Sequence, residues 1–352
     1  MIYPADKYEA KTGFDHVKQK IAALCLSRAA AARVDEIAFM TDFDSVSRHL
    51  RATHQMLTIE TGDTPLPIVA VNDITPALAR MRVPGTFLPA DELVSIRRAM
   101  QCIADLAAFF AARRHEDGTS LYPELDAEAR PLTPTPTVIA AINRVIDQYG
   151  QIRDNASSEL ATIRRSLQAT SGTINSIMRR VIARAVADGY LDSDTTPSVR
   201  DGRLVIPVSP MYKRKISGIV HDESASGKTV FIEPAEVVEA NNRLRELSIE
   251  ERREIVRILT ALADTIRPDI DGLLGGFDLL GIFDFIHAKA QFARSIEAAM
   301  PHLADRPELE WYHACHPVLR QSLERQGKAI VPLDIRLDAD HRLLVISGPN
   351  AG

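Results

Sequence analysis

The carboxyl end of the sequence has the residue types and spacing of a phosphate-binding loop. Residues 343–346 are apolar and lead into a small loop that contains two glycines. Gly348 fits the first glycine of the pattern G-x-x-x-x-G-K-[S/T], in which a lysine holds nucleotide phosphates and a hydroxyl residue holds Mg²⁺. The four spacer positions are Pro349, Asn350, Ala351 and Gly352. An ordinary strand followed by a turn is the alternative interpretation, because the lysine and the hydroxyl residue would come after residue 352.

A second group of residues could bind phosphates through charge alone. Between residues 195 and 233 the chain carries six basic and four acidic residues, against a net charge of −5 for the whole chain. The basic residues are Arg200, Arg203, Lys213, Arg214, Lys215 and Lys228. Such a patch neutralises a phosphate backbone without reading base identity. The alternative is a basic turn that is only solvated.

Two further clusters are weaker candidates. His313, Cys315 and His316 are metal-ligand types, but a structural zinc site needs four ligands, usually as two separated pairs. His221, with Ser224 and Ser226 nearby, resembles a hydrolytic cluster, yet neighbouring residues on a strand point to opposite faces. We therefore predict neither a metal site nor a catalytic residue in this chain.

The composition is that of a globular protein with more than one unit. The chain has 352 residues, of which 45% are hydrophobic, 25% charged and only 5% aromatic. The abundance of Ala, Leu, Arg and Glu favours helices. Three widely spaced cysteines favour a reducing compartment, and the sequence has no secretion leader and no apolar stretch of about 18 residues. These features predict a cytoplasmic protein with no membrane contact.

Long helices must position the basic patch. Helical patterns cover residues 8–60, 90–114 and 137–187, with prolines between them and a break at Tyr149 and Gly150. Two helices each carry one narrow apolar seam, so we expect them to pair antiparallel, as in a coiled coil. One seam is Leu160, Ile163, Leu167, Ile174, Ile177 and Val181, and the other is Leu244, Leu247, Ile255, Ile258, Leu262 and Ile266. Ser157 is the predicted start of the first helix.

The segment between the two helices is different in kind. Residues 204–208, 218–220 and 229–232 are rich in β-forming side chains and are separated by Gly, Pro and Ser. Asp201 and Gly202 form a dipeptide typical of a hairpin turn. The sequence therefore predicts a small β unit inserted between two long helices.

Several segments together resemble one family. Residues 218–234 match the pattern G-I-V-H-D-x-S-x-S-G-x-T-x-F-I-E-P, which is the most specific of the matches. Five others support it: residues 152–160, 200–208, 241–247, 314–319 and 347–352, the last of which is similar to T-G-P-N-x-G-G-K-[S/T]. The chain resembles the MutS superfamily of ATPases over essentially its whole length, specifically the second bacterial branch (MutS-two), which lacks the mismatch-reading domain. Cys315 departs from the pattern, since Arg is usual there.

The resemblance implies a mainly α fold with a small β insertion. It implies a helical core (1–136), a lever helix (137–195), a β-containing clamp (196–234), a returning lever helix with further core (235–310) and the first strands of a P-loop ATPase domain (311–352). It also implies ATP and Mg²⁺ as cofactors of the complete protein and a homodimer. Because the chain stops within the loop pattern, we expect it to bind no cofactor and to lack ATP hydrolysis. For the same reason we do not expect this part of the protein to form the homodimer.

The resemblance further implies a partner for the clamp. Members of the branch handle branched DNA, restrain recombination or act on collided ribosomes through rRNA, and a carboxy-terminal nuclease domain is common. The competing hypothesis is a helical arm that docks a protein partner through its β edges, without contact to nucleic acid.

Overall fold

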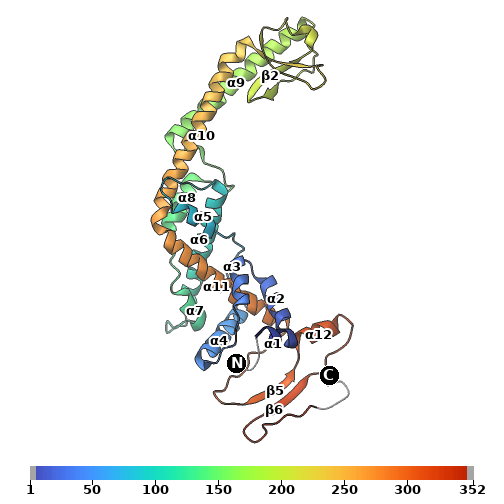
Figure 1. The fold of residues 1–352 in the computed structure, drawn as a ribbon. Coiled ribbons are helices and arrows are strands. Elements are labelled where there is room, and N and C mark those ends of the chain that lie inside the picture. The colour runs from blue at the N-terminus through green and yellow to red at the C-terminus, as the bar shows by residue number, and fades with distance from the viewer. Residues whose placement is uncertain (1–4, 347–352) are drawn as a thin grey trace. The chain divides into compact units, whose positions relative to one another are not determined.

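The computed structural model describes residues 5–346, which form twelve α-helices and six β-strands (Figure 1). The helices are α1 (Ala5–Thr12), α2 (Phe14–Leu24), α3 (Arg28–Asp35), α4 (Phe43–Glu60), α5 (Thr75–Met81), α6 (Ala90–Ala111), α7 (Pro123–Ala129), α8 (Pro136–Val145), α9 (Ser158–Ala187), α10 (Val238–Ile266), α11 (Ile270–Ser295) and α12 (Pro317–Glu324). The strands are β1 (Ser198–Arg200), β2 (Arg203–Val208), β3 (Gly218–Glu223), β4 (Val230–Pro234), β5 (Leu309–Ala314) and β6 (Leu333–Leu337). The predicted mainly α fold with a small β insertion is confirmed, and the sheets are antiparallel.

The chain divides into two compact units, each made of several segments. Among the described residues, the first unit contains residues 5–79, Ser95–Ile139 and residues 269–346. The second contains Arg80–Val94 and Ala140–Pro268. The second unit therefore holds both long seam-bearing helices and the sheet between them, which are the elements that carry the predicted basic residues.

Helix α11 is central to the first unit and packs against α2, α3 and α4. Its Asp284 is buried and accepts hydrogen bonds from the backbone N–H groups of Leu26 and Ser27, at 2.9 and 2.7 Å. These groups lie just before α3, so one carboxylate fixes the start of that helix against α11. The rings of Phe110 and Phe283, 5.3 Å apart, join α6 to the same core.

The carboxyl end of the described chain differs from the prediction. Strands β5 and β6 pair antiparallel, but the apolar residues 343–346, which would form a strand before the loop in either interpretation of this segment, are not in a strand. Leu343 and Val345 are 91% and 87% exposed, and residues 343–346 pair with no strand in the part of the chain that the structure describes. A strand exists only with a neighbour that completes its hydrogen bonds, and apolar strand character in the sequence does not supply one.

Helices α9 and α10 pack along each other and form the long axis of the second unit (Figure 1). The Ser157 hydroxyl, at the start of α9, donates at 2.6 Å to Glu254, in the middle of α10. Arg184, in the last turn of α9, donates to Glu236, just before α10, at 2.7 Å. Because residue numbers rise along one helix as they fall along the other, the pair is antiparallel, as predicted.

The apolar seams hold this pair together. Ser157 is the N-cap of α9, since its hydroxyl accepts a hydrogen bond from the Leu160 N–H at 3.0 Å. The buried seam residues are Leu160, Ile163, Ile174, Val181, Leu247, Ile258, Leu262 and Ile266, and the half-buried ones are Leu167, Ile177, Leu244 and Ile255. The 3.6-residue period thus indicated both the helices and the faces by which they pack.

A four-stranded antiparallel sheet lies at one end of the helix pair, in the order β1-β2-β4-β3. Its inner face shares a core with the second half of α9, in which Met178 and Val181 pack with Ile206, Val230 and Ile232. The predicted hairpin turn joins β1 to β2, with φ of 48° at Asp201 and 72° at Gly202. We call these four strands the clamp sheet; β1, only three residues long, was not predicted.

Candidate nucleic-acid interface

The loop of residues 209–217 must cross the length of the clamp sheet. Strands β2 and β3 both run antiparallel to β4, so β2 ends at the opposite end of the sheet from the start of β3. Two residues fix the loop on the way. The Tyr212 ring lies 5.6 Å from the ring of Tyr190, and Ile216 is buried in the core shared with α9. The loop is therefore a crossover connection that is held at two points by packing of its side chains.

The basic side chains between and beside these anchors are exposed. Lys213, Arg214 and Lys215 are all exposed, and within residues 5–346 their side chains make no hydrogen bond or ion pair. Lys228 has the same character and lies in the turn between β3 and β4. These four cations are available to an external anion, and Lys213, Arg214 and Lys215 are hereafter called the basic run.

The two arginines of the β1–β2 hairpin differ from the basic run. Arg200 lies over the ring of Phe231, 4.1 Å from its centroid, and its Nε is 3.4 Å from Asp222. Arg203 is mostly buried and donates to both oxygens of Glu233, at 2.9 and 3.0 Å, and to Asn242 at 2.8 Å. The Arg203 donors are thus used inside the protein.

Glu233 is the centre of a buried polar network. Its side chain is fully buried on β4. Besides Arg203, it accepts hydrogen bonds from the amide of Asn241 at 2.8 Å and from Nε2 of His221 at 2.5 Å. Burial alone would raise the pKa of this carboxyl, but the hydrogen bonds from Asn241, His221 and Arg203 outweigh it, and the pKa lies below its usual value of 4.5.

Asn241 connects this network to α10. Its amide nitrogen also donates to the carbonyl of Leu204 at 3.2 Å, and its Oδ1 accepts from the Leu204 N–H at 3.4 Å. The side chain is fully buried and completes the backbone hydrogen bonds of β2 as a neighbouring strand would. One residue therefore fixes the first turns of α10 to the sheet.

Residues 218–234, which carry the family signature, form β3, β4 and the turn between them. A Cβ on Gly218 would lie 2.1 Å from the carbonyl oxygen of Glu233, so only glycine permits β3 to lie so close to β4. The pairing shifts between Val220 and Asp222, and the bulge at His221 directs its ring to Glu233. Ser224 Oγ accepts from the Thr229 N–H at 3.0 Å and closes the next turn.

His221, Ser224 and Ser226 do not form a hydrolytic site. The His221 ring is committed to Glu233, whereas the hydroxyls of Ser224 and Ser226 contact each other at 3.4 Å in the turn. The decisive fact is the pairing of His221 with a buried carboxylate twelve residues away. Sequence spacing alone gave no indication of that contact.

The stability of the clamp sheet at acid pH should depend on the protonation of Glu233. Because its pKa is lower in the folded state, the ion pair contributes its full stability above about pH 4.5, and the contribution is lost as the pH falls below that value through the folded pKa. Hydrogen exchange of β2 and β4, compared between wild type and Glu233→Gln at each pH, should show a large difference at pH 7 that shrinks toward pH 3. A difference that stays constant over this range would contradict the assignment.

The remaining predicted residues lie elsewhere. Gly348, Pro349, Asn350, Ala351 and Gly352 lie outside the described residues. His316 is the N-cap of α12, where its Nδ1 accepts from Leu319 at 3.3 Å and its Nε2 contacts the carbonyl of Thr12 at 3.0 Å. Within residues 5–346 no group of three acidic, His or Cys side chains could hold a metal ion, and no helix is long and apolar enough to cross a membrane.

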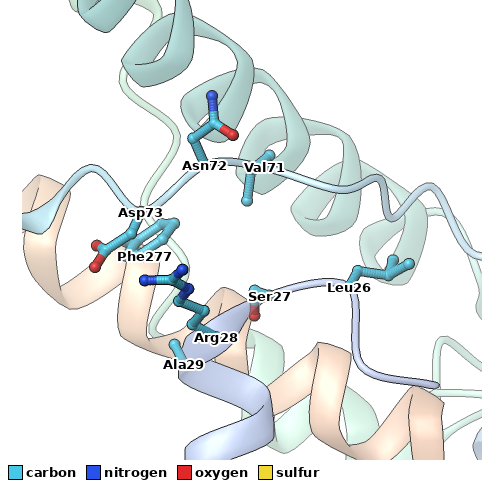
Figure 2. Close-up of a pocket in the computed structure, with 8 residues that line it drawn as sticks. All are labelled: Leu26, Ser27, Arg28, Ala29, Val71, Asn72, Asp73 and Phe277. Carbon is cyan, nitrogen blue, oxygen red and sulfur yellow. The ribbon is translucent and has the colours of Figure 1, made fainter. Parts of the chain in front are cut away.

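A pocket of about 360 Å³ in the first unit is separate from all of these residues (Figure 2). It is lined by Leu26, Ser27, Arg28, Ala29, Val71, Asn72, Asp73 and Phe277. None of the predicted site residues that the structure describes lies in it. The basic run of the second unit is the stronger candidate site, because several unpaired cations are concentrated there.

Comparison with known proteins agrees with the signature. No protein-family model matches the chain. The chain is 34% identical over 339 residues to a protein from Geobacillus sp. (strain WCH70) and 32% identical over 340 residues to one from Latilactobacillus sakei subsp. sakei (strain 23K), both named endonuclease MutS2. A protein of the same name from Finegoldia magna is 31% identical over 339 residues. Each match covers 96% of this chain but 42% of the relative, so the chain spans about two fifths of the relatives' length.

Proposed function

Because the chain belongs to the MutS2 branch of the MutS superfamily and corresponds to the amino-terminal part of such proteins, we propose that its second unit grips branched DNA. In this proposal helices α9 and α10 are the lever, and the clamp sheet with its loops is the clamp. The observation that carries the proposal is the basic run. Three consecutive cations are exposed and unpaired within the described chain, whereas the neighbouring Arg203 is fully paired inside the sheet. Contacts from such cations to phosphates release counterions and tolerate any base sequence.

The helix pair fits the role of a lever. Helices α9 and α10 contain 30 and 29 residues, and they are joined by an apolar seam together with polar contacts. Arg164 adds one of these contacts by donating to Glu251 of α10 at 2.7 Å. A pair tied at several levels moves as one body. A displacement at one end is therefore carried to the clamp sheet at the other.

We propose that this movement is driven by nucleotide in the full-length protein. Residues 311–352 would begin the ATPase domain, and residues 348–352 would contribute to binding ATP with Mg²⁺. Closure of a homodimer around DNA would then be coupled to the lever. The relatives are named endonucleases. For the full-length protein we accordingly propose a nuclease domain on the carboxy-terminal side of the ATPase domain.

The salt dependence of DNA binding tests the clamp. We expect the triple variant Lys213→Ala, Arg214→Ala, Lys215→Ala to bind branched DNA about tenfold more weakly at low salt. The slope of log affinity against log salt should fall in magnitude by about 1 for each side chain that contacts a phosphate. Fluorescence anisotropy with a labelled four-way junction, over a series of salt concentrations, measures both quantities.

The matched control is Arg245→Ala, Arg252→Ala, Arg253→Ala, which removes three arginines of α10 that are exposed and, like the basic run, make no ion pair within residues 5–346. It changes the net charge equally but leaves the loop intact. Equal losses in the two triple variants would indicate general electrostatic attraction and would contradict a localised grip. Tighter binding to an rRNA fragment than to the junction would move the proposal from DNA to the ribosome.

A protein-docking clamp is the second candidate, and one observation favours it. Strand β3 lies at the edge of the sheet, and Ile219 and Val220 on it are 49% and 47% exposed. An exposed strand edge with apolar side chains can add a strand from a partner. Association with a protein that does not weaken with salt, and that is lost in Val220→Lys, would support this function over the first.

A further inference from the structure

We propose that Met211 is an apolar wedge that enters an open base step of DNA while the basic run holds the adjacent phosphates. The inference rests on the proposed clamp function and adds to it a preference for DNA whose stacking is interrupted. Met211 is 77% exposed, and Lys213 follows it by two residues. Minor-groove and architectural proteins combine apolar wedges such as Met with basic residues in this way.

The backbone holds Met211 in a fixed position. It is the middle residue of the 3₁₀ turn Pro210–Tyr212. The Tyr212 N–H donates to the carbonyl of Ser209 at 2.9 Å, and the Lys215 N–H donates to the carbonyl of Tyr212 at 2.8 Å. Pro210 restricts its own φ as well. The side chain is therefore displayed with little backbone entropy left to lose on binding.

Met211 is exposed because other residues of its loop already fill the adjacent part of the core. The positions where this loop meets the core are already occupied by Tyr212 and Ile216, which pack with residues of α9 and the clamp sheet. The local order of the loop is thus one exposed apolar residue, one anchor, three exposed cations and a second anchor. This arrangement places an apolar side chain and several cations on one short, supported segment.

The balance between burying the Met211 side chain and unstacking a base step determines which DNA is preferred. Removing one Met side chain from water yields a free energy of the same order as the cost of unstacking one base step. At an intact step the two nearly cancel, so linear duplex gains nothing from the wedge. At a branch point or bulge the step is already open, and the gain remains. Met211 is accordingly a specificity residue, whereas the basic run supplies affinity.

DNA is the favoured occupant over RNA for a geometric reason. The minor groove of A-form RNA is wide and shallow, and proteins recognise duplex RNA there by shape and by its 2′-hydroxyl groups. A wedge beside phosphate-binding lysines is instead the arrangement that opens and bends B-form DNA. A bulged RNA duplex of the same sequence therefore serves as the competing ligand in the test.

The test compares affinities for a bulged DNA duplex and its linear counterpart. The variants are Met211→Ala, Met211→Leu and the control Val199→Ala, which shortens an apolar side chain of β1 that is 58% exposed. For Met211→Ala we expect the bulged-over-linear preference to fall about tenfold, with the affinity for linear duplex and the salt slope unchanged. Met211→Leu should restore the preference, and Val199→Ala should leave it as in the wild type.

A spectroscopic readout separates insertion from simple contact. With 2-aminopurine next to the bulge, binding of the wild type should raise the fluorescence as the base is unstacked, and Met211→Ala should remove that rise. An unchanged preference and an unchanged fluorescence rise in Met211→Ala would overturn the wedge while leaving the clamp proposal intact. Bulged RNA bound as tightly as bulged DNA would overturn the choice of DNA. Failure of the wild type to bind any of these duplexes would overturn the clamp proposal itself.

Discussion

Replacing Glu233 by Gln is expected to destabilise the clamp sheet by about 3 kcal/mol. The side chain is fully buried and neutralises Arg203, which is itself mostly buried. Removing the negative charge leaves the guanidinium without compensation in a site that water barely reaches. It also removes the acceptor that orients His221. The loss should be local, because all of these groups belong to the second unit.

Hydrogen exchange followed by mass spectrometry measures this loss on peptides that cover β2 and β4. Glu223→Gln is the matched control, because it makes the same chemical change at an exposed position of the same sheet. We expect protection of β2 and β4 to fall strongly in Glu233→Gln and to remain unchanged in Glu223→Gln. Equal protection in both variants would mean that the network contributes no stability.

Gly218→Ala is expected to cost about 3 kcal/mol and to detach the start of β3 from β4. The added Cβ would lie 2.1 Å from the carbonyl oxygen and 2.9 Å from the carbonyl carbon of Glu233. Both atoms are backbone, and the Ala235 N–H donates to the carbonyl of Ser217 at 2.9 Å, so neither strand can easily move away. The clash is therefore relieved only by opening the pair.

Gly227→Ala provides a graded control for this variant. Gly227 has φ of 66° and open space around the site of a Cβ, so alanine there meets conformational strain but no clash. We expect a cost of about 1 kcal/mol, without loss of β3 pairing. Urea titration with exchange protection of residues 218–223 as the probe distinguishes the two variants. A larger effect at Gly227 than at Gly218 would show that the close approach of β3 and β4 is not rigid.

These two variants also bear on how the signature of the family is interpreted. His221, Glu233 and Asn241 connect the clamp sheet to the first turns of α10, and Gly218 lets β3 lie close to β4. The basic run and Met211 are exposed and lie in the loop before the signature, whereas Lys228 is an exposed cation within it. Architecture and binding are thus assigned to neighbouring but different residues of one small sheet.

The sequence by itself determined the local elements and their faces. Apolar residues at a period of 3.6 placed α9 and α10 and the sides on which they pack, because burial of a helix face requires that spacing. Ser157 marked the start of α9, and Asp201 with Gly202 marked the hairpin, because a cap and a type I′ turn each depend on a few adjacent residues. The family signature likewise reflected a continuous stretch of chain.

Only the tertiary structure decided which polar residues are free and which are committed. Arg203 and Lys213 are equally basic in the sequence, yet Arg203 is paired with Glu233, thirty residues away, and Lys213 has no partner among the described residues. The exposure of Met211 and the missing strand at residues 343–346 were equally invisible beforehand. Pairing, burial and strand formation depend on neighbours brought together by folding, and the separation of those neighbours along the chain follows no period that a sequence displays.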